Sequence, residues 1–151
     1  MSHTQTIVVI GAGDALGSAI ARRFAREGYL AVLVRRDGEK LEPLVAQIKA
    51  EGGQAIGMAC DARQEDPMVA LFEQVERTHG PIAACVFNIG ANVRFPIVET
   101  TARVYFKVWE MACFAGFLAG REAARHMLTR NSGTIIFTGA TASLRGREGF
   151  S

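Results

Sequence analysis

The sequence predicts an α/β fold in which helices cover both faces of a parallel sheet. Two observations lead to this prediction. Apolar runs alternate with segments of helical periodicity along the chain, and each run is continuously hydrophobic. A continuous apolar strand is buried on both sides, so helices must lie on both faces of the sheet. With right-handed crossovers, the doubly wound strand order is 3-2-1-4-5.

The predicted elements follow one another along the whole chain. The apolar runs place strands at 6–10, 29–34, 54–60, 82–87 and 133–137, and the periodic segments place helices at 18–28, 41–51, 66–79 and 100–128. Asp66 suits an N-cap with Pro67 just inside the helix, and Thr100 or Thr101 can cap the last helix. The residues 1–151 thus form one domain, and its sheet is truncated after the fifth strand.

Length and composition exclude several classes of protein. A chain of 151 residues with 49% hydrophobic residues is a globular domain, not a disordered one. Seventeen basic and fifteen acidic residues, with no basic block beyond Arg35-Arg36, argue against nucleic acid as a partner. The first residues carry no export signal, and the apolar run 111–120 is shorter than the ~20 residues that span a bilayer. We therefore expect a cytoplasmic protein without a membrane partner.

The cysteines suggest a reducing environment. Cys60, Cys85 and Cys113 are odd in number, far apart and set in apolar surroundings. This pattern favours buried, reduced thiols over disulfides or a metal cluster. We expect no metal site.

The stretch 6–17 predicts a phosphate-binding turn between the first strand and the first helix. Gly11 supplies a free φ angle at the strand exit, Gly13 leaves room for a pyrophosphate, and Gly17 allows close contact between helix and strand. The N–H groups that open the following helix then face the phosphates.

Four stretches, in this order, resemble the short-chain dehydrogenase/reductase family. They are Gly11-Ala-Gly-Asp-Ala-Leu-Gly17, Asp61-Ala62, Asn88-Ile89-Gly90 and Gly133-Thr-Ile-Ile-Phe-Thr-Gly139. The resemblance covers nearly the whole chain and implies NAD(P)-dependent hydride transfer on a small-molecule alcohol or carbonyl. It identifies 1–151 as a Rossmann-like dinucleotide-binding domain that is incomplete at its C-terminal end.

The resemblance also assigns cofactor contacts. Asp61 matches the acidic residue that holds the adenine amino group, although a solvated charge is the alternative. Asn88 matches the asparagine that braces the fourth strand and the cofactor's ribose, although a turn asparagine is the alternative. Ala15 stands where the family has its middle glycine. The expected cofactor-binding residues are Gly11, Gly13, Asp14, Ala15, Leu16, Gly17, Arg35, Arg36, Asp61, Ala62, Asn88, Ile89 and Gly90.

The end of the second strand decides the choice of cofactor. A carboxylate there would bind a ribose 2′-hydroxyl, whereas an arginine would pair with a 2′-phosphate. Arg35 and Arg36 stand at this tip, which favours NADP over NAD. Asp14 and Asp37 could neutralise them, and a solvated pair of arginines is a further alternative.

The catalytic residues stay unassigned. The family uses a serine after the fifth strand, then a tyrosine and a lysine, with an asparagine in the preceding helix. Here Ala140 or Gly139 falls at the serine and Cys113 at the asparagine, and the tyrosine and lysine do not occur within the 151 residues. Thr141 or Ser143 could replace the serine. The alternative function is a catalytically inactive dinucleotide-binding protein with a sensing or assembly role.

The last predicted helix suggests self-association. The stretch 108–128 is apolar on more than one side, and Trp109, Phe114 and Phe117 suit core or subunit contacts better than a ligand cage. In relatives this helix meets its twin. We therefore expect a homo-oligomer formed through helix 108–128.

Overall fold

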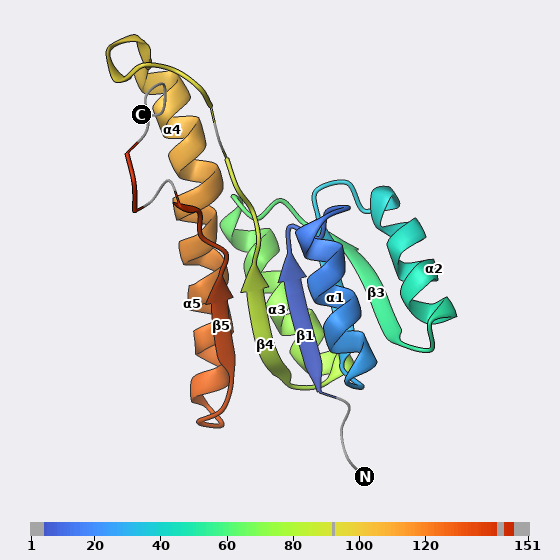
Figure 1. Cartoon of the computed structure of the whole chain (residues 1–151). Coiled ribbons are helices and arrows are strands. Elements are labelled where there is room, and N and C mark those ends of the chain that lie inside the picture. Colours follow the sequence, from blue (N-terminus) through green and yellow to red (C-terminus); the bar gives the residue numbers. More distant parts are fainter. Residues whose placement is uncertain (1–4, 92, 142–143, 147–151) are drawn as a thin grey trace.

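The computed structural model describes residues 5–91, 93–141 and 144–146. Their fold is an α/β, Rossmann-like one built on a five-stranded parallel sheet with the order β3-β2-β1-β4-β5 (Figure 1). The predicted fold class and strand order are confirmed. The strands are β1 (Thr6–Ile10), β2 (Leu30–Arg35), β3 (Gln54–Ala59), β4 (Ile82–Phe87) and β5 (Thr134–Phe137).

Helices connect the strands as the periodicity predicts. They are α1 (Leu16–Arg26), α2 (Glu42–Ala50), α3 (Glu65–His79), α4 (Ala102–Trp109) and α5 (Ala115–Leu128), with short 3-10 turns at η1 (Glu39–Leu41) and η2 (Ile97–Glu99). A π-helical segment, η3 (Glu110–Phe114), joins α4 to α5. Together these three form one long rod whose α4 end projects beyond the sheet (Figure 1).

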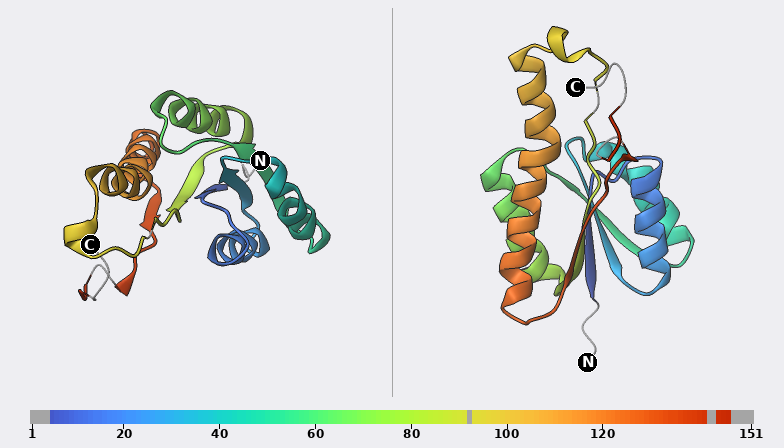
Figure 2. Two further views of the ribbon diagram at one scale, coloured as in Figure 1. Left: turned by 90° about the horizontal axis from the view of Figure 1, so that it is seen from above. Right: turned by 60° about the vertical axis from the view of Figure 1, so that its left-hand side comes forward.

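The sheet separates two apolar layers (Figure 2). Ile7 and Val9 of β1 belong to the layer under α1 and α2. Val8 and Ile10, which point to the opposite face, belong to the layer under α3 and α5. All four side chains are at most 1% exposed. The continuous apolar sequence of β1 therefore reflects burial on both faces, as predicted.

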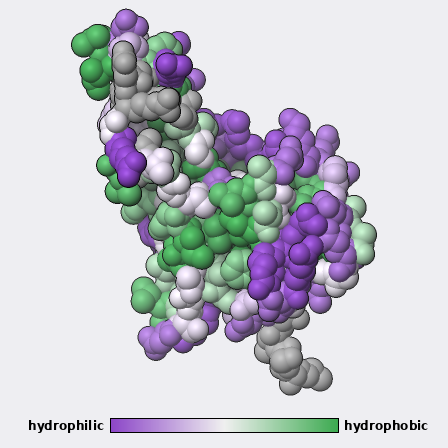
Figure 3. All heavy atoms as spheres, viewed as in Figure 1, coloured by the Kyte–Doolittle hydropathy of each residue, from purple (hydrophilic) through white to green (hydrophobic). Residues whose placement is uncertain are grey.

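The prediction of two covered faces is wrong for the edge strands. In β3, only Ala55 is buried and the other residues are partly or fully exposed, and β5 is mostly exposed. Ile135 of β5 packs against the layer under α5, whereas Ile136 remains 39% exposed. Figure 3 shows apolar surface between α1 and β5 on this uncovered side. Helix α2 packs against β3 and α5 packs against β5, but an edge strand has a neighbouring strand on one side only and is therefore less completely covered than β1.

Two helix starts refine the sequence prediction. The N-cap of α3 is Gln64, so the prediction that Asp66 caps this helix is wrong, and Asp66 lies in the first turn. The cap falls earlier because Gln64 closes a turn by donating its N–H to the Asp61 carbonyl oxygen at 3.0 Å. Of the two candidate caps of α4, Thr101 is the one used, since its side chain accepts from the Val104 N–H.

The three cysteines are free, but they are not all buried. Burial raises the pKa of Cys60 to about 11 and that of Cys85 to about 12, which makes both thiols poor nucleophiles at neutral pH. Cys113 is exposed, contrary to the prediction. It lies on η3, where the π-helical geometry changes which side chains face the sheet.

Helix α1 approaches β1 closely at Gly17. A Cβ atom at this position would lie 2.5 Å from the Gly11 carbonyl oxygen and 2.8 Å from the Ala12 Cα. Both atoms are backbone and cannot move aside without shifting the end of β1. The close helix–strand contact predicted for Gly17 is confirmed.

We expect Gly17→Ala to lower the free energy of unfolding by about 2–3 kcal/mol, because the added methyl overpacks a backbone contact. Urea unfolding monitored by circular dichroism measures this loss. Gly13→Ala is the matched control, since a Cβ there meets nothing within 4 Å. Equal stabilities of Gly17→Ala and Gly13→Ala would contradict the prediction.

Candidate functional site

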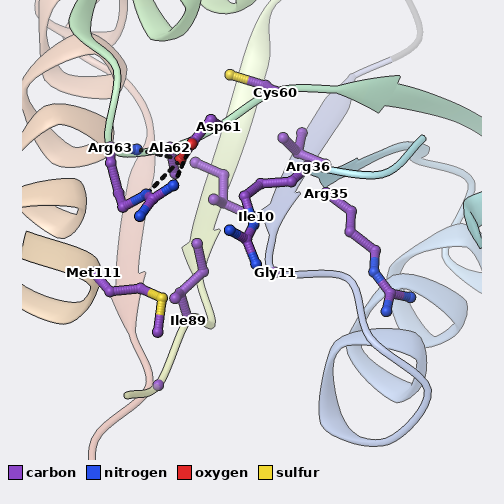
Figure 4. Close-up of a pocket in the computed structure, with 12 residues that line it drawn as sticks. Ile10, Gly11, Arg35, Arg36, Cys60, Asp61, Ala62, Arg63, Ile89 and Met111 are labelled. Atoms are coloured by element: carbon purple, nitrogen blue, oxygen red, sulfur yellow. Dashed lines mark hydrogen bonds and ion pairs between the residues drawn. The ribbon is translucent and has the colours of Figure 1, made fainter. Parts of the chain in front are cut away.

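A cavity of about 270 Å³ opens at the carboxyl ends of the strands (Figure 4). The ends of β1 and β2, the loops after β3 and β4, and η3 supply its walls. The lining residues are Ile10, Gly11, Val34, Arg35, Arg36, Cys60, Asp61, Ala62, Arg63, Ile89, Gly90 and Met111. In open α/β sheets, ligands bind at this end of the strands, where the chain order reverses between β1 and β4.

The structure brings together about half of the residues that the sequence predicts at the cofactor. The predicted residues that line the cavity are Gly11, Arg35, Arg36, Asp61, Ala62, Ile89 and Gly90. The others, except Asn88, belong to the turn before α1 and its first residues. They are Gly13, Asp14, Ala15, Leu16 and Gly17, with the Asp14 side chain 98% exposed. Their contacts with a cofactor stay a prediction.

The geometry at the start of the turn requires glycine. Gly11 has a φ of +84°, and a Cβ on it would lie 2.5 Å from the Asn88 carbonyl oxygen. Gly13 faces open space, which leaves its backbone accessible. Ala15, at the family's middle glycine, has a φ of −105° and serves as the N-cap residue of α1. Because this φ is negative, the position does not require glycine.

Asn88 joins β4 to the glycine turn. Its N–H donates to the Ile10 carbonyl oxygen at 2.7 Å, and its Nδ2 donates to the Gly11 carbonyl oxygen at 3.1 Å. The side chain is therefore a structural brace between the ends of β1 and β4. The predicted contact with a ribose stays a prediction.

The two arginines at the tip of β2 point in different directions (Figure 4). Arg35 lies 4.0 Å from the Asp14 carboxylate, which agrees with the expectation that Asp14 can neutralise one arginine. Asp37 pairs mainly with Lys40 at 3.0 Å, and this contact lowers the pKa of Asp37. Arg36 has no ion-pair partner among the residues that the structure describes. It is the less committed of the two cations.

Asp61 is not a solvated charge. The Arg63 side chain donates two hydrogen bonds to the Asp61 carboxylate, at 2.9 Å and 2.6 Å. Both side chains are only 28% exposed. The Arg63 guanidinium, with a smaller contribution from Arg36, holds the pKa of Asp61 below its usual range. Asp61 is thus ionised at neutral pH.

The sequence analysis did not identify Arg63 or Met111 as site residues. Arg63 follows Asp61 by two positions, and this close pairing of opposite charges at a strand end was the available signal. Its other Nη atom lies 3.7 Å from Glu110, the first residue of η3, and the adjacent Met111 lines the cavity. No local signal marked Met111, because its position depends on the path of a distant helix.

The residues that the sequence analysis aligned with the family's catalytic serine and asparagine lie after β5 and on η3, and that alignment stays a prediction. Ala140 and Gly139 follow β5, and Cys113 lies exposed on η3. The Thr141 carbonyl oxygen accepts from the N–H groups of Leu144 and Arg145, each at 3.0 Å, and Ser143 lies outside the described residues. Among the described residues, no cluster of acidic, histidine or cysteine side chains could hold a metal, and no helix could span a membrane.

Comparison with known proteins places the chain in a family. The model described as short chain dehydrogenase matches residues 5–151, so the chain belongs to the short-chain dehydrogenase/reductase family. It is 32% identical over 134 residues to a short chain dehydrogenase of Pseudocercospora fijiensis, covering 87% of this chain and 43% of that protein. The chain spans about half the length of the curated relatives it matches.

Solved structures agree with this assignment. A short-chain dehydrogenase from Rhodopseudomonas palustris is 55% identical with a TM-score of 0.92, covering 97% of this chain and 69% of that one. A metagenomic short-chain oxidoreductase in complex with NADP is 29% identical (TM-score 0.90; 99% and 69% covered). An NAD⁺-bound xylitol dehydrogenase is 26% identical (TM-score 0.92; 99% and 58% covered). Structural neighbours therefore bind either nicotinamide cofactor.

The Asp61–Arg63 contact predicts a pH-dependent contribution to stability. Because the Arg63 guanidinium holds the pKa of Asp61 in the folded chain below its ordinary value of 3.8, the stabilisation is present above that value and is lost as the pH falls through the folded pKa. We expect the wild-type chain to be more stable than Asp61→Asn at about pH 6, with the difference shrinking toward about pH 3. Urea unfolding across this range measures the difference.

Glu73→Gln is the control, because it removes an exposed carboxylate from the middle of α3. A stability difference between wild type and Asp61→Asn that stays constant with pH would contradict the assignment.

Proposed function

We propose that this chain binds NADP and forms the cofactor-binding part of an oxidoreductase that transfers hydride to or from a small-molecule alcohol or carbonyl. The observation that carries the proposal is the pair of arginines at the tip of β2, both lining the cavity beside the glycine turn. An NAD-binding site of this fold has an acidic residue near that tip, where it contacts the ribose 2′-hydroxyl. A guanidinium instead pairs with a 2′-phosphate.

The local charges favour Arg36 as the phosphate ligand. Arg35 forms an ion pair with Asp14 at 4.0 Å, whereas Arg36 has no ion-pair partner among the described residues. The pairing of Asp61 with Arg63 further limits the acidity of the cavity. A dianionic 2′-phosphate would thus meet a cationic wall. NAD is the less favoured cofactor.

We expect the chain to bind NADPH more tightly than NADH, and Arg36→Ala to remove most of this preference. A lost charge-assisted hydrogen bond is worth about 1.5–3 kcal/mol, or about 10- to 100-fold in affinity. Fluorescence titration of both cofactors measures the two dissociation constants. Arg26→Ala is the control, because it removes an α1 arginine that pairs with Glu51 away from the cavity. Equal affinities in the parent chain would contradict the proposal.

A second candidate is a catalytically inactive dinucleotide-binding protein with a sensing or assembly role. Ala140 at the serine position and the exposed Cys113 at the asparagine position favour it, because a methyl cannot donate a hydrogen bond and a thiol is a weak donor. The longer reading frame separates the two candidates. A Tyr-x-x-x-Lys sequence shortly after Ser151 favours the enzyme, whereas a residue that is not an acid at that tyrosine favours the binder.

The proposed protein acts in the cytoplasm as a homo-oligomer. Its three free cysteines suit a reducing compartment.

A ladder of aromatic rings runs along α4, η3 and α5, with centroid separations of 5.7, 5.7 and 6.3 Å between consecutive members. Its members are Phe106, Trp109, Phe114 and Phe117. Phe106, Trp109 and Phe117 are 57%, 40% and 56% exposed, an apolar surface suited to a second copy of the helix.

We expect the chain to form a homodimer or larger assembly at low micromolar concentration, and Phe117→Glu to shift it toward monomer. A charge placed in the aromatic ladder must be desolvated when two copies meet, which opposes association. Light scattering coupled to size exclusion measures the mass. Ala46→Glu adds the same charge to the exposed face of α2 and should leave the mass unchanged. A monomeric parent would contradict the expectation.

A further inference from the structure

The cavity contains a third arginine that the proposed function leaves unused. Arg63 lies on the loop after β3 and lines the same cavity as Arg36. Unlike Arg36, it pairs with two carboxylates, those of Asp61 and Glu110. Any effect of Arg63 on a ligand would therefore act through the Asp61 carboxylate that it contacts.

The Arg63–Asp61 contact is a bidentate pair. Arg63 Nε donates to Asp61 Oδ1 at 2.9 Å, and Arg63 Nη2 donates to Oδ2 at 2.6 Å. The Arg63 backbone N–H also donates to Oδ1, at 3.1 Å. A rigid guanidinium fork of this kind fixes the plane of a carboxylate, which a single point charge does not.

The number of free acceptor positions follows from these bonds. An ionised carboxylate offers about four lone-pair positions. Two donors occupy Oδ1 and one occupies Oδ2. About one acceptor position on Oδ2 remains, and Asp61 lines the cavity. A ligand therefore meets a carboxylate with a fixed orientation and room for a single N–H or O–H donor.

A second contact holds the fork from the other side. Arg63 Nη1 lies 3.7 Å from the Glu110 carboxylate on η3. The loop after β3 is thereby linked to the helix segment whose Met111 lines the cavity. Figure 4 shows Arg63 on the side of the cavity nearer Met111 and Arg36 on the opposite side. Rotation of Arg63 away from Asp61 would have to rearrange this second contact too.

We propose that Arg63 is a positioning residue that presents Asp61 as a single, oriented acceptor, and thereby makes the site select a 6-aminopurine over a 6-oxopurine in the bound dinucleotide. The inference rests on the proposed function, because it assumes that a nicotinamide–purine dinucleotide occupies the cavity. The amino group of adenine donates to the remaining Oδ2 position. The 6-oxo group of hypoxanthine is an acceptor, and it would face a carboxylate that cannot turn away.

The test compares NADPH with its hypoxanthine analogue, in which a 6-oxo group replaces the 6-amino group. Fluorescence titration gives both dissociation constants for the parent, Arg63→Gln and Arg63→Lys. We expect the adenine-to-hypoxanthine affinity ratio to fall about fivefold or more in Arg63→Gln, because the freed carboxylate can reorient and hydrate. Arg63→Lys keeps the charge without the fork and should retain an intermediate ratio. If Arg63→Gln does not fold, the ratio in Arg63→Lys decides.

The matched control is Arg22→Gln. Arg22 also makes a bidentate contact, with the Glu51 carboxylate, and its side chain is 33% exposed. It does not line the cavity. The control should keep the parent ratio. An unchanged ratio in the Arg63 variants would overturn the inference, and so would tighter NADPH binding by Arg63→Gln, because Arg63 would then be a competitor for Asp61. A parent that binds neither dinucleotide would instead refute the proposed function.

Discussion

The close contacts around the Gly11 backbone are the constraint on which the rest of the structure depends. Its N–H donates to the Val34 carbonyl oxygen of β2, and its carbonyl oxygen accepts from Asn88 after β4. The same carbonyl oxygen leaves no room for a side chain on Gly17 of α1. Three strands and a helix thus converge on one residue, and only glycine permits this at a positive φ. The cavity exists where these elements meet.

Arginines rather than carboxylates set the electrostatics of that cavity. Each of the nearby acidic groups is associated with a cation: Asp14 with Arg35, and Asp61 with Arg63. The arrangement leaves Arg36 as the cation available to a ligand among the described residues. Because paired charges contribute little net field, the distribution of partners matters more than the count of arginines. A simple tally of charges at the end of β2 could not have distinguished Arg35 from Arg36.

The sequence predicted those features that depend on local spacing. The requirement for glycine at Gly11 and Gly17 and the tolerance of Ala15 follow from patterns within a few residues, and the strand order follows from the alternation of strands and helices together with right-handed crossovers. Arg63, Met111 and the exposure of Cys113 depend on the path of distant elements. The π-helical segment η3 is the main example, because one continuous helix was predicted where the structure has an interruption. The spacing of five residues between Trp109 and Phe114 fits the wider i→i+5 turn, but the sequence analysis assigned both rings to one broad face of a regular helix.

The π-helical segment η3 also connects the cavity to the aromatic ladder. Glu110, at its start, contacts Arg63 and hence the carboxylate in the cavity. Phe114, at its end, stacks between Trp109 and Phe117 in the aromatic ladder. A π-helical segment is less stable than a regular α-helix, and such segments are often found at functional sites. If a second copy covers the ladder, as proposed above, it would restrain the same segment that supports the Arg63–Asp61 contact, and association and cofactor binding would then act on a shared element.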